Sequence, residues 1–441
     1  MAYKDRARLA SFELLMNVEM KDAYANLEMP QILKKFKLEG RDAAFATELG
    51  YGTLRMQGLY DTYIAKVSDR PISKIDVKVL NVLRLALHQI ITLKTPSHAA
   101  TSESVELARY VAGKSTTGFV NAILRKSLEI SKHMEWGDSV SEIACQYSHP
   151  EWIVQSYLDV LQDKDQVIEL LKANNLPAKP DLIAWPGKSD RELEAGEVIP
   201  HTQCGFTSSI APINLPGVAA RRIGVQDRGS QIVTEIFLAT SKSSSNEEHK
   251  LAWLDMCAGP GGKAAYIYNY LAKFRPQDTF IANEISPHRA ELVARVVPKE
   301  VVTVNPGQQL SGIFDRILID APCTGLGALR RRPESRWRKN IGNLKELVGI
   351  QRELLDKASE LLAAEGIIAY VTCSPHNAET RLQVADFLHR HPNFRLLSVV
   401  PYIDQDLKQY VSSNGALQLW THINNSDSMF IALFQKNSRG S

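Results

Sequence analysis

Two cysteines stand where a thiol could do chemistry. Cys323 follows the apolar stretch 314–321, and Cys373 follows the apolar stretch 366–372. Both stretches have the composition of buried parallel strands, and open α/β sheets bind their ligands where such strands end. A proline directly precedes Cys323, which also places this thiol at a strand exit. We therefore expect two thiols to face one pocket, an arrangement suited to covalent catalysis.

A glycine-rich turn, Asp255–Lys263, follows a third apolar stretch and predicts a cofactor loop. Glycines let the backbone approach a ligand closely, and the helix that follows offers free N–H groups. The glycine spacing is neither G-x-G-x-x-G nor a phosphate-binding G-K-[ST] loop, so S-adenosylmethionine fits better than NAD. The next apolar stretch ends at Glu284, whose carboxylate can bind ribose hydroxyls. The alternatives are a purely structural turn and a solvated Glu284.

The two thiols and a nearby carboxylate suit methylation of cytosine. Its C5 atom is a poor nucleophile until a thiolate adds to C6. Asp320, three residues before Cys323, can stabilise that adduct by protonating or hydrogen-bonding N3. The second thiol or another base can then help to remove the C5 proton and eliminate the first thiol. Chemistry alone does not say which cysteine attacks, and a lone cysteine is more often a small buried hydrophobe.

A basic segment follows Cys323 and predicts contact with RNA. Arginines bind phosphates, an exposed indole stacks on bases, and a target base in folded RNA would swing out to reach the pocket. The alternative is a solvated loop. The predicted RNA-binding residues are Arg330, Arg331, Arg332, Arg336, Trp337 and Arg338.

Composition and charge narrow the class of protein. The chain has 441 residues, of which 44% are hydrophobic and 23% charged, as in globular proteins of two or three domains. Its five cysteines are odd in number and widely spaced, which argues against a disulfide framework, and no spacing resembles a zinc site. The chain has no apolar run long enough for a membrane span and no signal core at the start, so we expect it to be cytoplasmic. We also expect a monomer that binds no metal.

The predicted architecture has three parts. Residues 1–130 read as an all-α helical bundle, with breaks at Pro30 and Gly40 among others, and carry 19 Lys and Arg against 14 Asp and Glu. Residues 131–224 predict a small α/β connector. Residues 225–441 alternate apolar strands with helices, which implies a doubly wound, Rossmann-like α/β sheet.

Four strands are predicted in the third part, and one long helix lies before the last of them. The strands are Leu251–Met256, Thr279–Asn283, Phe314–Asp320 and Gly366–Thr372. The helical stripe ends at Leu361, and Gly366 is predicted to close it. The polar stretch Ser241–Lys250 is predicted to be a surface insertion.

These motifs resemble the RNA 5-methylcytosine methyltransferases of the NOL1/NOP2/Sun family. The resemblance rests on Asp255–Lys263, Asp320–Cys323 and Thr372–Ser374. The N-terminal part is similar to the NusB-type RNA-binding helical domain, through stretches such as Asp42–Arg55 and Gly118–Arg125. Together the matches cover nearly the whole chain and resemble the bacterial branch that acts on 16S ribosomal RNA.

The resemblance also implies roles for individual residues. Cys373 would attack C6, Cys323 would serve product release, and Asp320 would face the polar edge of the ring, with Lys263 completing the catalytic set. The implied S-adenosylmethionine contacts are Cys257, Ala258, Gly259, Pro260, Gly261, Gly262, Lys263, Glu284, Arg289 and Asp320.

One departure from the family pattern lies between the predicted strands Thr279–Asn283 and Phe314–Asp320. The family usually has an Asp near the end of a strand in this interval that contacts adenine, whereas this chain has Asn305 and Pro306 there. The sequence leaves two rival functions open: the same chemistry on transfer RNA, and a non-catalytic RNA-binding protein with a decayed methyltransferase half.

Overall fold

The computed structural model describes residues 3–188, 196–243 and 249–437. The chain forms two compact units, each built from two segments. The first unit comprises Met1–Pro177 and Leu329–Lys339, and the second comprises Ala178–Ala328 and Asn340–Ser441. None of the helices in the described ranges is long and apolar enough to cross a membrane.

The first unit is all helical, as predicted for residues 1–130. Its helices are α1 (Arg6–Met20), α2 (Ala25–Phe36), α3 (Gly40–Val67), α4 (Val77–Leu87), α5 (Ser97–Ala112), α6 (Thr117–His133), α7 (Val140–Gln146), α8 (Glu151–Leu161), α9 (Lys164–Asn174) and α14 (Ser335–Arg338). The predicted break at Pro30 is wrong, because this residue lies inside α2, whereas Gly40 does begin a helix.

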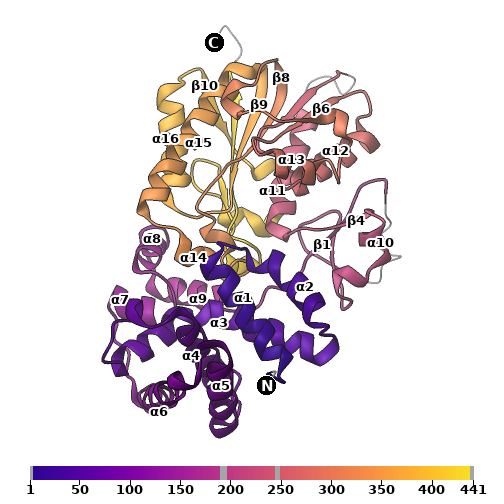
Figure 1. Cartoon of the computed structure of the whole chain (residues 1–441). Coiled ribbons are helices and arrows are strands. Elements are labelled where there is room, and N and C mark those ends of the chain that lie inside the picture. The colour runs from indigo at the N-terminus through magenta and orange to yellow at the C-terminus, as the bar shows by residue number, and fades with distance from the viewer. Residues whose placement is uncertain (1–2, 189–195, 244–248, 438–441) are drawn as a thin grey trace. The chain divides into compact units, whose positions relative to one another are not determined.

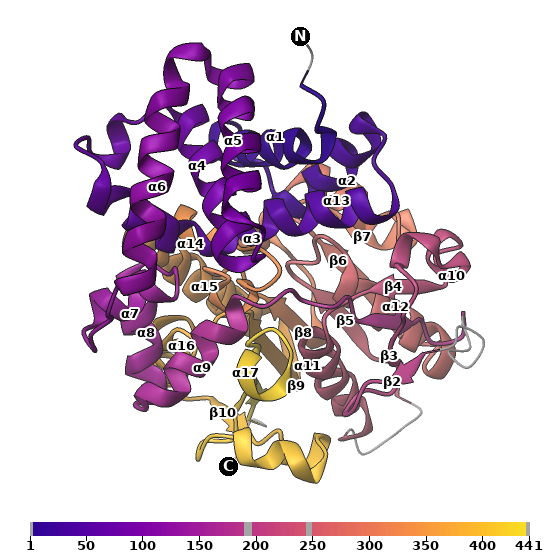
Figure 2. The ribbon, with the colours of Figure 1, turned by 90° about the horizontal axis from the view of Figure 1, so that it is seen from below.

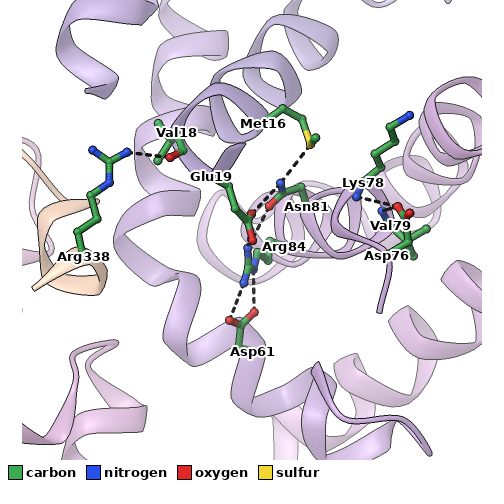
Figure 3. Close-up of polar contacts among 10 residues, drawn as sticks. All are labelled: Met16, Val18, Glu19, Asp61, Asp76, Lys78, Val79, Asn81, Arg84 and Arg338. Atoms are coloured by element: carbon green, nitrogen blue, oxygen red, sulfur yellow. Dashed lines mark hydrogen bonds and ion pairs between the residues drawn. The ribbon is translucent and has the colours of Figure 1, made fainter. Parts of the chain in front are cut away.

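Helix α4 is the centre of the bundle formed by α1 to α6 (Figure 2). All of its residues from Val79 to Leu87 are buried, and it contacts α1, α3, α5 and α6. The side chain of Asp76 caps the helix by accepting hydrogen bonds from the backbone N–H groups of Lys78 and Val79 (Figure 3).

One buried cation ties three of these helices together (Figure 3). Arg84 of α4 donates to both carboxylate oxygens of Asp61 in α3, each at 2.8 Å. It also donates to Glu19 of α1 at 3.2 Å and to Asn81 at 3.0 Å. The guanidinium is only 5% exposed, so its charge depends on these partners for compensation.

The second unit contains a small sheet near its start. Its strands are β1 (Leu182–Ala184), β2 (Glu197–Val198), β3 (Gly205–Thr207) and β4 (Ile223–Val225), in the antiparallel order β2-β3-β1-β4, with α10 (Pro216–Ala219) before β4. Residues 131–224, predicted as one connector, thus divide between the units: the helices α7 to α9 belong to the first unit and these strands to the second.

The large sheet has the order β10-β12-β9-β8-β5-β6-β7, with β11 paired to β12. Its strands are β5 (Ala252–Asp255), β6 (Thr279–Asn283), β7 (Val302–Thr303), β8 (Phe314–Asp320), β9 (Leu362–Thr372), β10 (Phe394–Leu397), β11 (Leu417–Gln418) and β12 (Phe430–Lys436). Strands β5 to β9 pair in parallel, whereas β10 to β12 pair antiparallel.

Helices cover both faces of this sheet, as the doubly wound prediction requires (Figure 1). One apolar core joins α11 and α12 to one face, and another joins α15 and α16 to the other. The helices of this unit are α11 (Arg228–Ala239), α12 (Gly262–Phe274), α13 (Pro287–Val293), α15 (Ile341–Leu361), α16 (Arg381–Arg390) and α17 (Thr421–Asn424).

Two local predictions in this unit have different outcomes. Gly366 does not close α15, because the helix ends at Leu361 and Gly366 lies within β9. The predicted insertion Ser241–Lys250 falls largely on residues 244–248, which lie outside the described residues.

The Arg84 network yields a stability prediction. Replacing Arg84 with Ala leaves Asp61 without its cation in a partly buried site, so we expect the free energy of unfolding to fall by about 2–3 kcal/mol. Lys35→Ala is the control, because Lys35 pairs with Glu13 while 62% exposed, and should cost less than about 1 kcal/mol. Urea denaturation followed by circular dichroism measures both. Equal costs for the two variants would contradict a bundle held by Arg84.

Candidate active site

The register between β8 and β9 brings the two predicted thiols together. Asp320 in β8 pairs with Val371 in β9, and the N–H of Ala321 donates to the carbonyl of Val371 at 2.9 Å. Cys323 and Cys373 follow directly, with their Sγ atoms 3.4 Å apart. Both side chains are partly buried and neither forms a disulfide.

A partly buried ion pair lies at the same edge of the sheet. Lys263, in the first turn of α12, donates from Nζ to Oδ2 of Asp320 at 2.8 Å. Asp320 therefore has the partner that a carboxylate at the end of an apolar strand needs. Burial acts to lower the pKa of Lys263, but the charge and hydrogen bond of Asp320 outweigh it, so that the pKa lies above its usual value.

The pKa values of the two thiols are shifted in opposite directions. The hydrogen bond between them lowers the pKa of Cys373, and the positive charge of Lys263 adds to this effect. The same hydrogen bond, reinforced by burial, raises the pKa of Cys323 well above its usual value. A thiolate is the nucleophilic form of cysteine, and the contact between the two sulfurs allows either one to be the donor.

The predicted cofactor loop packs on Glu284. This residue is 2% exposed, and its carboxylate accepts from the N–H groups of Gly259 at 2.9 Å and Ser286 at 3.0 Å. Arg289 lies 3.6 Å from Glu284 and also donates to the carbonyl of Gly259. Glu284 is thus not the solvated residue of the alternative interpretation.

The loop packs closely against its neighbours because its glycines lack side chains. A Cβ atom on Gly259 would lie 2.3 Å from Oε2 of Glu284, and one on Gly261 would lie 2.7 Å from Val296. Gly261 also has a φ angle of +114°, which favours glycine. From Gly262 onward α12 presents its free N–H groups at the edge of the sheet where Cys373 lies.

A buried carboxyl in this loop lacks a complete set of partners. Asp255 is fully buried, its Oδ1 accepts from the N–H of Cys257 at 3.3 Å, and its Oδ2 has no hydrogen-bond partner among the described residues. Burial, followed by the negative charge of Asp320, raises the pKa of Asp255 to about 8. An orphaned acceptor beside a glycine loop fits the ammonium group of an amino-acid-bearing cofactor.

The departure at Asn305 and Pro306 lies just after β7, where Asn283 binds the backbone. The amide of Asn283 donates to the carbonyl of Asn305 at 3.0 Å, and its oxygen accepts from the N–H of Asn305 at 3.2 Å. Pro306 then precedes a short 3₁₀ turn, Gly307–Gln309. Within the described part of the chain, no cluster of three His, Cys, Asp or Glu side chains is arranged to hold a metal ion.

Comparison with known proteins agrees with this geometry. Residues 241–435 match the family model described as "16S rRNA methyltransferase RsmB/F", and residues 5–129 match the NusB family. A putative methyltransferase of Mycobacterium tuberculosis is 38% identical, with 98% of this chain and 97% of that protein covered. Ribosomal RNA small subunit methyltransferase B of Vibrio cholerae is 30% identical, with 83% and 85% covered.

The chain belongs to the RsmB/F methyltransferase family. A solved structure, that of PH0851, shares the fold with a TM-score of 0.79 at 19% identity, covering 99% of this chain and all of that one. The predicted fold and family are therefore confirmed: a NusB-type helical domain and a methyltransferase domain with a largely parallel sheet.

In this RsmB/F protein, Arg336 of the basic segment does not have the role in RNA binding that was predicted for it. Arg336 is completely buried in the helical unit, where its guanidinium donates to the carbonyls of Arg55, Ser148 and Asn174 and to the side chain of Asn175, at 2.8–3.2 Å. A guanidinium that donates all these hydrogen bonds is not available to phosphates, so Arg336 stabilises the helical unit from inside.

Neighbouring residues share this internal role in part. Arg338 donates to the carbonyls of Val18, Asp22 and Ala23, at 2.6–3.0 Å, as Figure 3 shows for Val18. The predicted exposed indole is also wrong: Trp337 is partly buried, and a Cβ atom on Gly58 would lie 2.4 Å from its ring. The run Arg336-Trp337-Arg338 carries no sequence signal that separates packing from RNA contact.

The arginines at the start of the segment are placed differently. Arg331 and Arg332 are exposed, and Arg332 lies over the ring of Tyr24 at 5.7 Å. Arg330 is 8% exposed. Of the six predicted RNA-binding residues, Arg331 and Arg332 are therefore the ones that present a charge at the surface, and their contact with RNA stays a prediction.

Sequence reasoning missed one acidic residue of the site. Glu379 is completely buried and accepts a hydrogen bond from the backbone N–H of Thr324, the residue after Cys323, at 2.8 Å. It follows Cys373 by six residues, and an isolated Glu in a polar stretch carries no periodic or motif signal in a single sequence.

We predict that Asp255→Asn changes how stability depends on pH. A carboxyl with a pKa of about 8 when folded and about 4 when unfolded releases a proton on unfolding between these values, so the wild type loses stability as pH rises. Asp255→Asn should remove up to about 1.4 kcal/mol of this decline per pH unit. Thermal unfolding between pH 5.5 and 8.5 measures it, with the exposed Asp406→Asn as control. Parallel wild-type and Asp255→Asn curves would disprove the buried neutral carboxyl.

We also predict that two arginines of the basic segment separate folding from RNA binding. Arg336→Ala should lower the free energy of unfolding by about 3–5 kcal/mol, because buried carbonyls lose their donor. Arg331→Ala should change it by less than about 0.5 kcal/mol but flatten the salt dependence of RNA affinity. Urea unfolding and filter binding at several salt concentrations measure the two effects. A stable Arg336→Ala variant with weakened RNA binding would reverse the assignment.

Proposed function

We propose that this RsmB/F-family protein transfers a methyl group from S-adenosylmethionine to C5 of a cytosine in RNA of the small ribosomal subunit. The observation that carries the proposal is the pair of thiols 3.4 Å apart beside the Lys263–Asp320 ion pair. The RNA class is supported by the Vibrio cholerae relative, whose name specifies ribosomal RNA of the small subunit.

The residues that would hold the cofactor fit its chemistry. Asp255 offers a buried acceptor for the ammonium group, Glu284 offers a carboxylate for ribose hydroxyls, and the N-terminus of α12 offers N–H groups to the methionine carboxylate. When bound, S-adenosylmethionine supplies a methyl group on a positively charged sulfur, which a nucleophilic carbon can accept.

The first step uses the thiol with the lowered pKa. The Cys373 thiolate adds to C6 of cytosine, a C–S bond forms, and the electron pair of the C5–C6 double bond becomes available at C5. Asp320, at the end of β8, would hold a proton or hydrogen bond at N3, which withdraws charge from the ring. Lys263 fixes Asp320 in place and keeps a positive charge next to the adduct.

The second step restores the aromatic ring. Once C5 carries the methyl group, its proton must leave and the bond between C6 and the sulfur of Cys373 must break. Cys323, whose Sγ lies 3.4 Å from that of Cys373, would give its proton to the departing sulfur, and the Cys323 thiolate left behind would accept the proton from C5. Its raised pKa suits a group that supplies a proton to the leaving sulfur.

The experiment that tests the proposal combines two cysteine variants. Cys373→Ala should abolish methyl transfer from radiolabelled S-adenosylmethionine, because no group would add to C6. Cys323→Ala should instead accumulate a covalent protein–RNA adduct, visible as a retarded band on a denaturing gel, because release is slowed. Unmodified 16S and transfer RNA transcripts serve as substrates, and nucleoside analysis identifies the product.

Three outcomes would contradict this assignment. An adduct in Cys373→Ala but not in Cys323→Ala would exchange the roles of the two thiols. Methyl transfer to transfer RNA alone would retain the chemistry and replace the substrate. RNA binding without any methyl transfer would favour the non-catalytic alternative. The control is Cys145→Ala, because Cys145 lies outside the large sheet and its removal tests the general effect of losing a thiol.

A further inference from the structure

Glu379 joins the chain segments that carry the two thiols. Its Oε1 atom accepts from the N–H of Thr324 at 2.8 Å and from Nε2 of Gln351 at 3.1 Å, and its Oε2 atom accepts from the hydroxyl of Thr324. Thr324 is the residue next to Cys323, so this carboxylate binds the Cys323 loop through both the backbone and the side chain of Thr324.

The same contacts continue to the second thiol. The hydroxyl of Thr324 lies 3.1 Å from that of Ser374, the residue next to Cys373. The N–H of Gly327 donates to the carbonyl of Cys373 at 2.9 Å, which ties the end of the Cys323 loop to the same point. Glu379, Thr324 and Ser374 therefore form a polar bridge between the loops after β8 and β9.

Burial of the Glu379 carboxylate in this bridge is unfavourable for the free energy of folding. Glu379 is completely buried, and the hydrogen bonds that the structure shows to its side chain all come from neutral groups. Neutral donors compensate a buried charge less well than a cation does. An amide or hydroxyl could connect the loops at lower cost, so the charge itself needs an explanation.

We propose that Glu379 is a positioning residue that sets the geometry of the two thiols through Thr324 and, by its negative charge, biases the shared proton toward Cys323. The proposal rests on the proposed cytosine chemistry. It explains why one thiol of a chemically equal pair acts as nucleophile and the other as proton donor.

The electrostatic surroundings are consistent with this bias. The negative charge of Glu379 adds to the hydrogen bond of Cys373 and to burial in raising the pKa of Cys323. On the other side of the pair, Lys263 favours the thiolate of Cys373, while Asp320 and Asp427 oppose it. Glu379 thus acts on Cys323 from one side, and Lys263 acts on Cys373 from the other.

Two substitutions separate the geometric role from the electrostatic one. Glu379→Gln keeps the shape and can still accept from the N–H of Thr324, but it removes the charge. Glu379→Ala removes both. The matched control is Gln383→Ala, because Gln383 is buried in the same network but bonds to Gln351 and to the carbonyl of Val348 and not to the thiol loops.

The readout is the rate at which iodoacetamide alkylates Cys323 and Cys373 in the full chain, measured at a series of pH values that extends far enough above neutral to include both midpoints and located by peptide mass spectrometry. In Glu379→Gln we expect the midpoint for Cys323 to fall by about one pH unit, since a nearby negative charge is lost. In Glu379→Ala we expect methyl transfer to fall by about tenfold or more, since the thiols are displaced. Glu379→Gln should restore most of that rate near neutral pH, with a shifted pH profile.

Unchanged alkylation midpoints in Glu379→Gln would overturn the proposed role of the charge. Effects of Glu379→Ala no larger than those of Gln383→Ala would overturn the positioning role. If Glu379→Ala does not fold, the Gln variant still decides the question. The alkylation needs neither RNA nor cofactor, so its result stands apart from any failure of the proposed methyl transfer.

Discussion

The parallel pairing of β8 with β9 is the constraint on which the site depends. Parallel strands end at the same edge of a sheet, and the pairing of Asp320 with Val371 places Cys323 and Cys373 next to each other, although they are 50 positions apart in the sequence. A shift of one residue in this register would turn the alternate side chains of β9 to the opposite face of the sheet. Side chains of β8 and β9 pack into two apolar cores, one on each face of the sheet, which helices cover.

Each charged side chain at this edge of the sheet makes its own set of contacts. Lys263 neutralises Asp320, Glu284 shapes the glycine loop, and Glu379 joins the two cysteine loops. Two apolar cores lie on the faces of the sheet, and the ionisable groups of the site lie in the turns and the helix start that follow the strands. This separation explains how one sheet can be tightly packed and still present several ionisable groups to a ligand.

The sequence was sufficient for residues whose role follows from a strand end or a glycine turn. Thr279–Asn283 and Phe314–Asp320 coincide with β6 and β8, and the expected proximity of the two thiols is what the structure shows. Arg336 and Glu379 could not be assigned, because their burial depends on segments distant in sequence: Arg55 and Ser148 for the one, Thr324 and Gln351 for the other. Charged residues are rarely fully buried, so composition argues against both placements.

The most direct test of the account is to identify the cysteine that bonds to the target base in the wild-type protein. RNA in which cytidine is replaced by 5-fluorocytidine cannot lose a proton from C5 after methylation, so the covalent adduct persists. Digestion and mass spectrometry of that adduct, formed with S-adenosylmethionine, then locate the modified peptide. The account predicts a nucleotide on Cys373. A nucleotide on Cys323, or methylated RNA without any protein adduct, would contradict it.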